Sequence, residues 1–262
     1  MKPDNVNKRP AENLIALEIH SVSKTFHSDS GRKVQALEGV NLLVRQGEFI
    51  TLVGATGCGK TTLLNLVAGL DTPDDGYLRV GNNLRFGDNV AYVFQHYTLF
   101  PWRSALGNVA FGLQMRGVPR KQRKSRASDL LARVGLSGFE NAYPYELSGG
   151  MRQRAAIAQA LAIQPKLLLM DEPFGAVDDS TRSELQQMLT ELWQDHLPTI
   201  LFVTHNIDEA IVLGGRVLVL SERPGKIEHE FKIDLPRPRN RMTKEFTNLF
   251  IKIRQLLSVQ LD

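Results

Sequence analysis

The sequence predicts an α/β fold whose core is a mixed, largely parallel β-sheet. Residues 49–53 form an apolar run that leads into a glycine-rich loop and then into a helical pattern, the order found in α/β units. Apolar runs typical of central parallel strands recur at residues 166–170 and 199–203, with a helical stretch, residues 179–195, between them. Strands that alternate with helices in this way predict parallel pairing through right-handed crossovers.

The length and composition of the chain are those of a globular protein. Its 262 residues, 42% of them hydrophobic and 23% charged, suffice for one large α/β domain and a smaller subdomain. The 32 Lys and Arg residues against 28 Asp and Glu residues give a net charge of +4, which is too small to predict nucleic-acid binding without a localised patch. No apolar run approaches the ~20 residues of a membrane-spanning helix, so any membrane role is predicted to be peripheral. Cys58 is the only cysteine, which excludes an intrachain disulfide and favours the cytosol.

The first part of the chain predicts a polar tail and a strand-rich start. Residues 1–14 are polar and contain prolines, unlike a signal peptide, so we expect a disordered tail ahead of a main domain over residues 15–241. Strands are expected over residues 17–26, 40–44 and 49–53, which predicts an N-terminal antiparallel β-subdomain. Because residues 40–44 and 49–53 flank a polar four-residue turn, we expect them to form a strand pair.

The rest of the chain predicts a helical insertion, a hairpin and a closing helix. Residues 104–165 have a helical pattern with a crowd of basic side chains, which predicts a helical subdomain. Residues 216–221 and 226–233 are separated by a turn sequence and predict a β-hairpin. Residues 242–262 predict an amphipathic helix whose apolar stripe packs on its own domain. The stripe consists of Phe246, Leu249, Phe250, Ile253, Leu256 and Leu257.

Residues 54–62 fit the phosphate-loop pattern G-x-x-x-x-G-K-[ST]. The glycines allow backbone N–H groups to crowd around nucleotide phosphates, and the helix that begins at Lys60 adds the positive end of its dipole. Lys60 supplies a positive charge, and the Thr61 hydroxyl is placed to bind the Mg²⁺ that bridges the phosphates. At the same helix start, bare amides are expected to lower the pKa of the Cys58 thiol. The predicted nucleotide-binding residues of the loop are Gly54, Ala55, Thr56, Gly57, Cys58, Gly59, Lys60, Thr61 and Thr62.

Two carboxylates follow the apolar run 167–170, at the carboxyl end of a predicted strand, where ligands of α/β sheets gather. Asp171 is placed to hold Mg²⁺, and Glu172 is placed to polarise a water molecule that attacks the γ-phosphate. The alternative, two surface acids at a strand end, is disfavoured because exposed acids seldom follow four apolar residues directly.

A second candidate phosphate site is the helix start at Ser148, Gly149 and Gly150. Ser148 is a natural N-cap, and the two glycines leave the backbone amides uncovered. Two such helix starts, far apart in one chain, would serve different nucleotides if two copies of the chain packed head to tail. On its own, the stretch is better interpreted as an ordinary helix cap.

These motifs together resemble the ATPase subunit of an ABC transporter, and the resemblance runs from about residue 17 to residue 241. Residues 54–62 resemble the Walker A loop, residues 147–153 resemble the family signature, and Asp171 and Glu172 resemble the Walker B acid and the catalytic glutamate. Further matches are Phe26 with the aromatic residue that stacks on adenine, Gln95 with the Q-loop glutamine, Asp178 with the D-loop and His205 with the switch histidine.

The resemblance implies the ABC-ATPase form of the P-loop NTPase fold, with a helical subdomain that carries the signature motif and a site for ATP and Mg²⁺. It implies that Glu172, His205 and Gln95 act in hydrolysis. It also implies that Thr61, Gln95 and Asp171 bind or sense the metal. Phe26 and Asp178 would contact the nucleotide, and the Ser148 helix start would contact ATP bound by a partner copy. A homodimer, or a heterodimer with a similar ATPase, is therefore expected.

Four short stretches, residues 100–103, 108–113, 223–225 and 236–239, resemble the nitrate, sulfonate and taurine importers. In that branch the ATPase binds a permease dimer at the cytoplasmic face of the inner membrane, and an extracytoplasmic solute-binding protein selects the solute. The resemblance therefore leaves the solute open. The alternatives are an exporter or lipoprotein-release ATPase and a nucleic-acid-associated ABC ATPase; the last is disfavoured because one uninterrupted cassette carries all the motifs.

Overall fold

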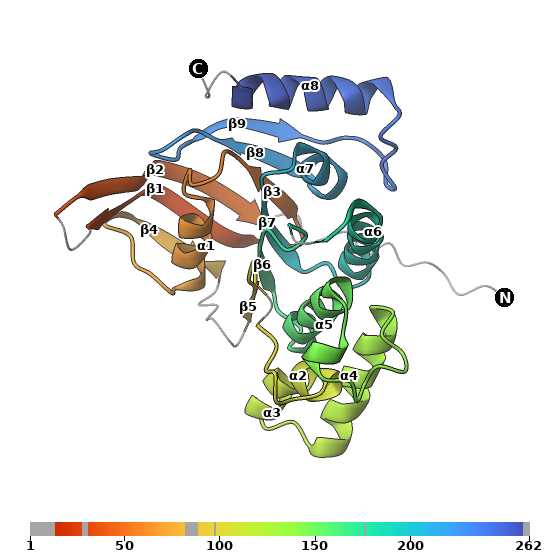
Figure 1. The fold of residues 1–262 in the computed structure, drawn as a ribbon. Coiled ribbons are helices and arrows are strands. Elements are labelled where there is room, and N and C mark those ends of the chain that lie inside the picture. The colour runs from red at the N-terminus through yellow and green to blue at the C-terminus, as the bar shows by residue number, and fades with distance from the viewer. Residues whose placement is uncertain (1–13, 28–30, 82–88, 97, 176, 259–262) are drawn as a thin grey trace.

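The central sheet runs β5-β6-β7-β3-β8-β9 in the part of the chain that the computed structural model describes, which is residues 14–27, 31–81, 89–96, 98–175 and 177–258 (Figure 1). Neighbouring strands are parallel from β5 to β8, and β9 runs antiparallel to β8. β3, β6 and β7 are buried along their whole length, as expected of strands covered on both faces. The strands are β3 (Phe49–Val53), β5 (Val90–Val93), β6 (Leu167–Asp171), β7 (Thr199–Thr204), β8 (Arg216–Leu220) and β9 (Ile227–Lys232).

A separate antiparallel sheet, in the order β2-β1-β4, shows that one predicted strand pair is wrong. β2 (Lys33–Arg45) pairs with β1 (Ile15–His27), which also pairs with β4 (Asp75–Val80). Residues 40–44 therefore do not pair with β3, and the polar turn between them carries the chain from one sheet to the other. The reason is burial: every residue of β3 is buried, so this strand takes parallel neighbours, β7 and β8, on both edges.

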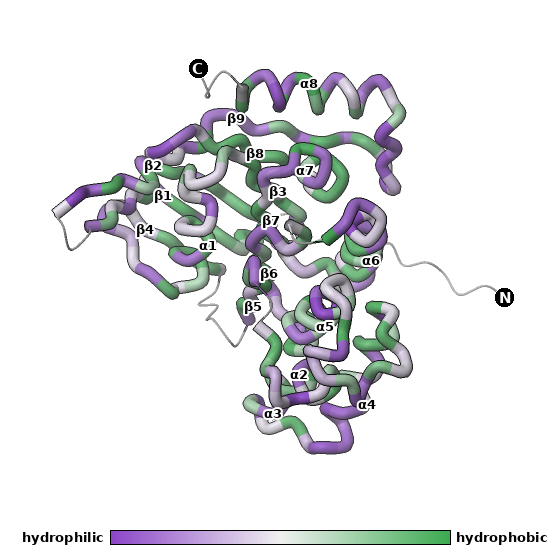
Figure 2. The backbone as a smooth tube through the Cα atoms, viewed as in Figure 1, coloured by the Kyte–Doolittle hydropathy of each residue, from purple (hydrophilic) through white to green (hydrophobic). Residues whose placement is uncertain are grey.

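The hairpin predicted near the end of the chain is confirmed, and the structure has a helix over Lys244–Ser258 of the predicted range 242–262, whose last four residues lie outside the described part of the chain. β8 and β9 form the hairpin, and α8 (Lys244–Ser258) lies on α7 (Ile207–Leu213) (Figure 1). Phe246 and Ile253 of the predicted stripe are buried in one cluster with α7, β8 and Ile233. Figure 2 shows hydrophobic and hydrophilic residues alternating along α8, as an amphipathic helix requires. In the described residues, no helix is both long enough and apolar enough to span a membrane. The predicted tail lies outside the described residues apart from Leu14.

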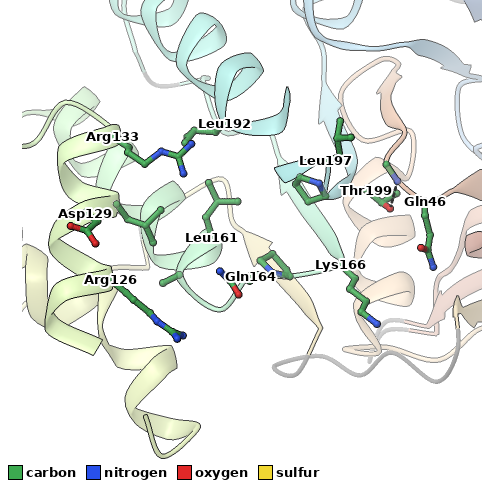
Figure 3. A pocket seen from close by; sticks show the side chains of 15 residues that line it. Gln46, Arg126, Asp129, Arg133, Leu161, Gln164, Lys166, Leu192, Leu197 and Thr199 are labelled. Carbon is green, nitrogen blue, oxygen red and sulfur yellow. Dashed lines mark hydrogen bonds between the residues drawn. The ribbon is translucent and has the colours of Figure 1, made fainter. Parts of the chain in front are cut away.

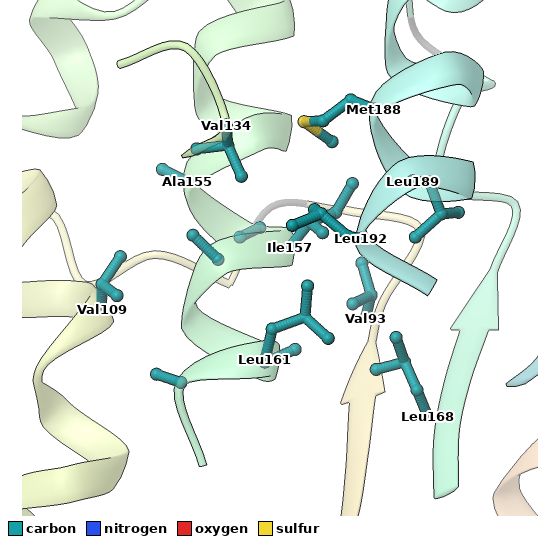
Figure 4. Close-up of a cluster of buried hydrophobic side chains, with 14 of the residues drawn as sticks. Val93, Val109, Val134, Ala155, Ile157, Leu161, Leu168, Met188, Leu189 and Leu192 are labelled. Carbon is teal, nitrogen blue, oxygen red and sulfur yellow. The ribbon is translucent and has the colours of Figure 1, made fainter. Parts of the chain in front are cut away.

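A helical lobe lies between β5 and β6 in sequence, and helix α5 attaches it to the core. Ile157 and Leu161 of α5 share an apolar cluster with Leu168 of β6 and Leu192 of α6 (Figure 4). The helices of the lobe are α2 (Ala105–Val109), α3 (Phe111–Met115), α4 (Arg120–Arg133) and α5 (Gly149–Ala162), and the 3₁₀ turn η2 (Pro144–Glu146) precedes α5. Helix α6 (Asp179–His196) follows β6 and belongs to the core.

Beside this contact, a pocket of about 580 Å³ separates α4 from the start of β7 (Figure 3). Its lining is mixed: the charged side chains of Arg126, Asp129 and Lys166 lie beside apolar residues such as Leu161 and Leu192. The lobe is therefore held to the sheet by the apolar face of α5, and the pocket lies between α4 and the core.

Candidate active site

The phosphate loop, residues 54–59, joins the end of β3 to the start of α1 (Lys60–Ala68) (Figure 1). Gly57 and Gly59 have φ angles of +81° and +111°, which residues with a side chain rarely adopt. A Cβ atom on Gly59 would lie 2.6 Å from the carbonyl oxygen of Ala36, and one on Gly54 would lie 2.8 Å from the Cys58 Sγ. The glycines are therefore needed for the path of the loop itself.

Lys60 is a buried cation inside this loop, only 5% exposed. Its Nζ donates hydrogen bonds to the carbonyl oxygens of Gly54 (2.9 Å) and Ala55 (2.8 Å). The same Nζ lies 3.8 Å from Glu172 Oε1. A buried charge requires such partners, and this one is held by groups that phosphate oxygens could replace. The loop, the helix start and Lys60 together form a site suited to the phosphates of a nucleotide.

The structure brings Thr61 and Asp171 together, as predicted. The Thr61 hydroxyl donates to Asp171 Oδ1 (3.2 Å), and the Tyr92 hydroxyl donates to Asp171 Oδ2 (3.3 Å). Burial raises the pKa of Asp171, and the hydrogen bond from Thr61 opposes that effect. One hydroxyl and one carboxylate within hydrogen-bonding distance form a donor set of the kind that Mg²⁺ prefers. The contact of Tyr92 with Asp171 was not predicted. In the sequence, only the position of Tyr92 on the strand that leads to Gln95 could have indicated it.

The side chains of Glu172 and His205 are also in contact. Because β6 and β7 are parallel neighbours, their carboxyl ends lie side by side, with Asp171 opposite Val203. Glu172, the next residue, has a positive φ of 42° and donates its backbone N–H to the Val203 carbonyl (2.9 Å). His205 Nδ1 lies 2.8 Å from Glu172 Oε2. The left-handed backbone at Glu172 turns the chain at the strand end, and a non-glycine residue in this region is costly unless its surroundings hold it there.

Two other predicted residues lie at exposed positions. Gln95 follows β5 and is exposed; within the described residues it makes no hydrogen bond to Asp171 or Glu172. Phe26, on β1 of the small sheet, is 42% exposed, and Lys24 Nζ lies 5.4 Å from the centre of its ring. An exposed aromatic ring of this kind is available to stack on a planar base.

The helix start at Ser148 lies against the start of α6 rather than against the phosphate loop. The Ser148 hydroxyl accepts the Met151 N–H (3.2 Å), which confirms the predicted N-cap. A Cβ atom on Gly150 would lie 2.5 Å from Thr181 Cγ2. Asp178 in turn caps α6, since its carboxylate accepts the Thr181 N–H (2.9 Å). In Figure 1, α5 lies apart from α1, the helix that begins at the phosphate loop of the same chain.

Two arginines, the buried Arg239 and the half-buried Arg237, which the sequence did not predict, hold α7, the helix that follows His205. Arg239 is 9% exposed and donates to the carbonyl oxygens of Ile211 and Gly214 at the end of α7. Arg237 donates to the carbonyls of Val212 and Leu213. Burial lowers the pKa of Arg239 to about 9 and that of Arg237 to about 10, so both stay charged at neutral pH. The carbonyls and the negative end of the helix dipole stabilise these charges.

The predicted lowering of the Cys58 pKa is wrong. Burial raises the pKa of this thiol, and the nearby Lys60 charge only partly offsets the effect. Cys58 is 2% exposed and packs in the apolar cluster beneath the loop. We therefore expect a maleimide to label the native protein at least ~10-fold more slowly than the unfolded chain, because the reactive thiolate is both scarce and covered. Labelling followed by mass spectrometry is the check; rapid labelling of the native chain would contradict it.

A phosphate loop, a buried lysine, a paired threonine and aspartate, and a glutamate in contact with a histidine define a P-loop nucleoside-triphosphatase. A family model described as "ABC transporter" matches residues 37–175. The uncharacterized ABC transporter ATP-binding protein MJ0412 of Methanocaldococcus jannaschii is 47% identical, over 98% of this chain and 96% of that protein. The nitrate import ATP-binding protein NrtD of Synechocystis sp. is 47% identical, over 87% of this chain and 88% of that protein. The taurine import ATP-binding protein TauB of Rhizobium johnstonii is 45% identical, over 84% of this chain and 85% of that protein.

Solved structures agree. The dimeric post-hydrolysis structure of the ATP-binding cassette MJ0796 with ADP and Pi has a TM-score of 0.73 and 33% identity, over 83% of this chain and 98% of that one. The chain belongs to the ABC transporter family, and it is an ATP-binding subunit with ATPase activity. The predicted ABC-ATPase fold and the resemblance to the nitrate, sulfonate and taurine branch are confirmed.

Proposed function

We propose that this chain is the ATP-hydrolysing subunit of an importer for a small anionic or polar solute of the nitrate, sulfonate or taurine type. The observation that carries the proposal is its 45–47% identity, over more than four fifths of both chains, to nitrate and taurine import ATP-binding proteins. A separate permease dimer would conduct the solute, and an extracytoplasmic binding protein would select it. The ATPase would lie at the cytoplasmic face of the membrane as a peripheral subunit.

In the proposed reaction, the loop amides and Lys60 bind the β- and γ-phosphates of ATP. Thr61 and Asp171 would hold Mg²⁺, with Gln95 completing its surroundings; the bound ion would neutralise charge on the phosphates. Glu172 accepts a proton from the attacking water, and His205, 2.8 Å from it, orients the carboxylate and contacts the γ-phosphate. The close contacts Thr61–Asp171 and Glu172–His205 support these roles.

Two copies of the chain are proposed to share each ATP head to tail. The Ser148 start of α5 is capped and carries two glycines, yet it lies apart from the phosphate loop of its own chain (Figure 1). This arrangement supports a role toward the nucleotide of a partner copy, and the similar MJ0796 cassette is dimeric. Asp178, beside that helix start through Thr181, would lie at the same interface.

The permease is proposed to dock beside Gln95, where the helical lobe meets β5. A groove of about 620 Å³ runs between them, and much of its lining is apolar. Trp102, at the edge of the lobe, is 70% exposed and lies 5.4 Å from the Phe100 ring, between ring centres. A large exposed apolar surface of this kind suits an amphipathic helix laid in a groove. The lining includes Phe94, Phe100, Phe111, Met115 and Ile163.

Replacing Trp102 with Ala should weaken binding to the permease by about 10-fold or more while ATP binding stays unchanged, because exposed tryptophans at interfaces often dominate their affinity. The measurement is co-purification of the permease with tagged chain, quantified against total membrane permease. Met242→Ala, at an apolar residue 92% exposed and remote from the groove, is the matched control. Equal permease recovery with Trp102→Ala and the parent would contradict docking at this groove, and loss of folding would instead indicate a core role.

The proposed function is tested by reconstitution. The chain would be combined in vesicles with a candidate permease and binding protein, and uptake of nitrate, taurine, an alkanesulfonate and bicarbonate would be followed with and without internal MgATP. ATP-dependent uptake of one of them supports the proposal. ATP-dependent release of lipoprotein or efflux of solute would support the exporter alternative, and co-purification with DNA or ribosomes instead of permease would support the nucleic-acid alternative.

A further inference from the structure

The β8–β9 turn, residues 222–225, is fastened to the phosphate loop and to β2. The Gly225 N–H donates to the Ala36 carbonyl (2.9 Å), and the Gly225 carbonyl accepts the Glu38 N–H (3.1 Å). A Cβ atom on Gly225 would lie 2.2 Å from the Cys58 carbonyl oxygen, so the turn and the loop are in direct backbone contact. The turn is therefore a fixed platform beside the loop.

Arg223 extends from this platform to the phosphate loop. Its Nε and Nη2 both donate to the carbonyl oxygen of Gly57, at 3.1 Å and 2.7 Å. The turn that carries it is closed internally, since the Ser221 hydroxyl accepts the Lys226 N–H (2.8 Å) and lies 3.0 Å from the Pro224 carbonyl oxygen. The guanidinium thus reaches Gly57 from a rigid base.

Holding the Gly57 carbonyl also orients the Cys58 N–H, because the two groups belong to one peptide unit and point in opposite directions in a trans peptide. With the carbonyl held by Arg223, the Cys58 N–H points across the loop and donates a hydrogen bond to the Ala55 carbonyl oxygen (3.3 Å). A charge-assisted bond to the carbonyl also polarises the peptide, which makes its N–H a stronger donor. The Arg223 contact and this hydrogen bond together hold residues 55–58 in one conformation of the loop that would surround the phosphates.

We propose that Arg223 is a positioning residue for ATP. It fixes the Gly57–Cys58 peptide and, with it, the turn that the Cys58 N–H closes on the Ala55 carbonyl, so that the loop keeps the shape that would surround the phosphates, and it adds a positive charge beside them. This role concerns ATP binding, which is common to the family, and the proposal does not depend on which solute or permease the chain serves. Removing this contact should weaken ATP binding more than it slows hydrolysis at saturating ATP, because Arg223 does not contact Glu172, His205 or Asp171 in the described residues.

The test compares Arg223→Gln, Arg223→Lys and Lys226→Gln in the full chain. Lys226 is the matched control, because it lies in the same hairpin and its Nζ pairs with Glu38 (3.1 Å) rather than with the loop. For Arg223→Gln we expect the Kd and KM for MgATP to rise about 10-fold, as for loss of one charged hydrogen bond, with kcat within about twofold. Arg223→Lys should recover part of the affinity, since an ammonium group can replace one of the two N–H donors but cannot reproduce the paired hydrogen bonds of the guanidinium.

Thermal unfolding without nucleotide separates positioning from folding. An unchanged unfolding temperature together with a raised Kd supports the proposal. An unchanged Kd in Arg223→Gln, an equal rise in Lys226→Gln, or a fall in kcat with KM unchanged would each overturn it. If Arg223→Gln fails to fold, Arg223→Lys decides alone: a Kd equal to that of the parent overturns the proposal, and an intermediate rise supports it.

Discussion

Replacing Glu172 with Gln should lower the rate of ATP hydrolysis about 10²-fold or more and leave ATP binding intact. Gln has the shape of Glu but cannot accept the proton of the attacking water, and loss of a general base has an effect of this size. Binding should persist because the loop glycines and Lys60 are unaltered; Lys60 even loses a competing carboxylate, 3.8 Å from its Nζ. With hydrolysis blocked, ATP should hold two copies together.

The measurements are steady-state ATPase assays and size-exclusion chromatography with and without MgATP. Glu245→Gln, at an exposed residue in the first turn of α8, is the control for the loss of a negative charge and should hydrolyse ATP at the parental rate. A Glu172→Gln chain that turns over ATP at a near-normal rate would exclude Glu172 as the base. One that stays monomeric with MgATP would exclude the shared-nucleotide dimer.

The parts of the site that could be predicted from sequence are those encoded in short, contiguous patterns. Residues 54–62 lie between a buried strand and a helix, so the motif and both flanking elements could be identified from one contiguous stretch. Asp171 ends a fully buried strand and Glu172 follows it, so their position at the carboxyl edge was also predictable. His205 could be placed beside Glu172 only through the family resemblance, because their contact depends on β6 and β7 being neighbours, which spacing in sequence does not show.

The parts that were missed depend on contacts between distant segments. Arg223 reaches Gly57 across 166 positions of the chain, and the hairpin pattern that predicted its turn gave no direction for its side chain. The buried Arg239 is stabilised by helix carbonyls rather than by an acid, so no charge pairing in the sequence indicated it. The Cys58 pKa was predicted from the helix dipole alone, and burial, which depends on the packed cluster beneath the loop, outweighs it.

Replacing Lys60 with Ala should raise the Kd for MgATP about 100-fold and reduce hydrolysis to background. Lys60 is the buried cation of the phosphate loop, and its Nζ occupies the space between the Gly54 and Ala55 carbonyls and Glu172. Its removal takes away the charged hydrogen bonds that Nζ would make to the β- and γ-phosphates, and two such losses of about 1.5 kcal/mol each correspond to roughly that factor. Isothermal titration with MgATP measures the change.

Lys60→Arg should not restore binding, because the guanidinium is larger than the ammonium and the site leaves Lys60 only 5% exposed. Lys166→Ala, at an exposed lysine just before β6, removes the same charge away from the loop and should bind MgATP with the parental Kd. If Lys60→Ala folds, as judged by circular dichroism, and still binds MgATP with a Kd near that of the parent, the phosphates do not lie within reach of Lys60, and the loop would have to be assigned a different occupant.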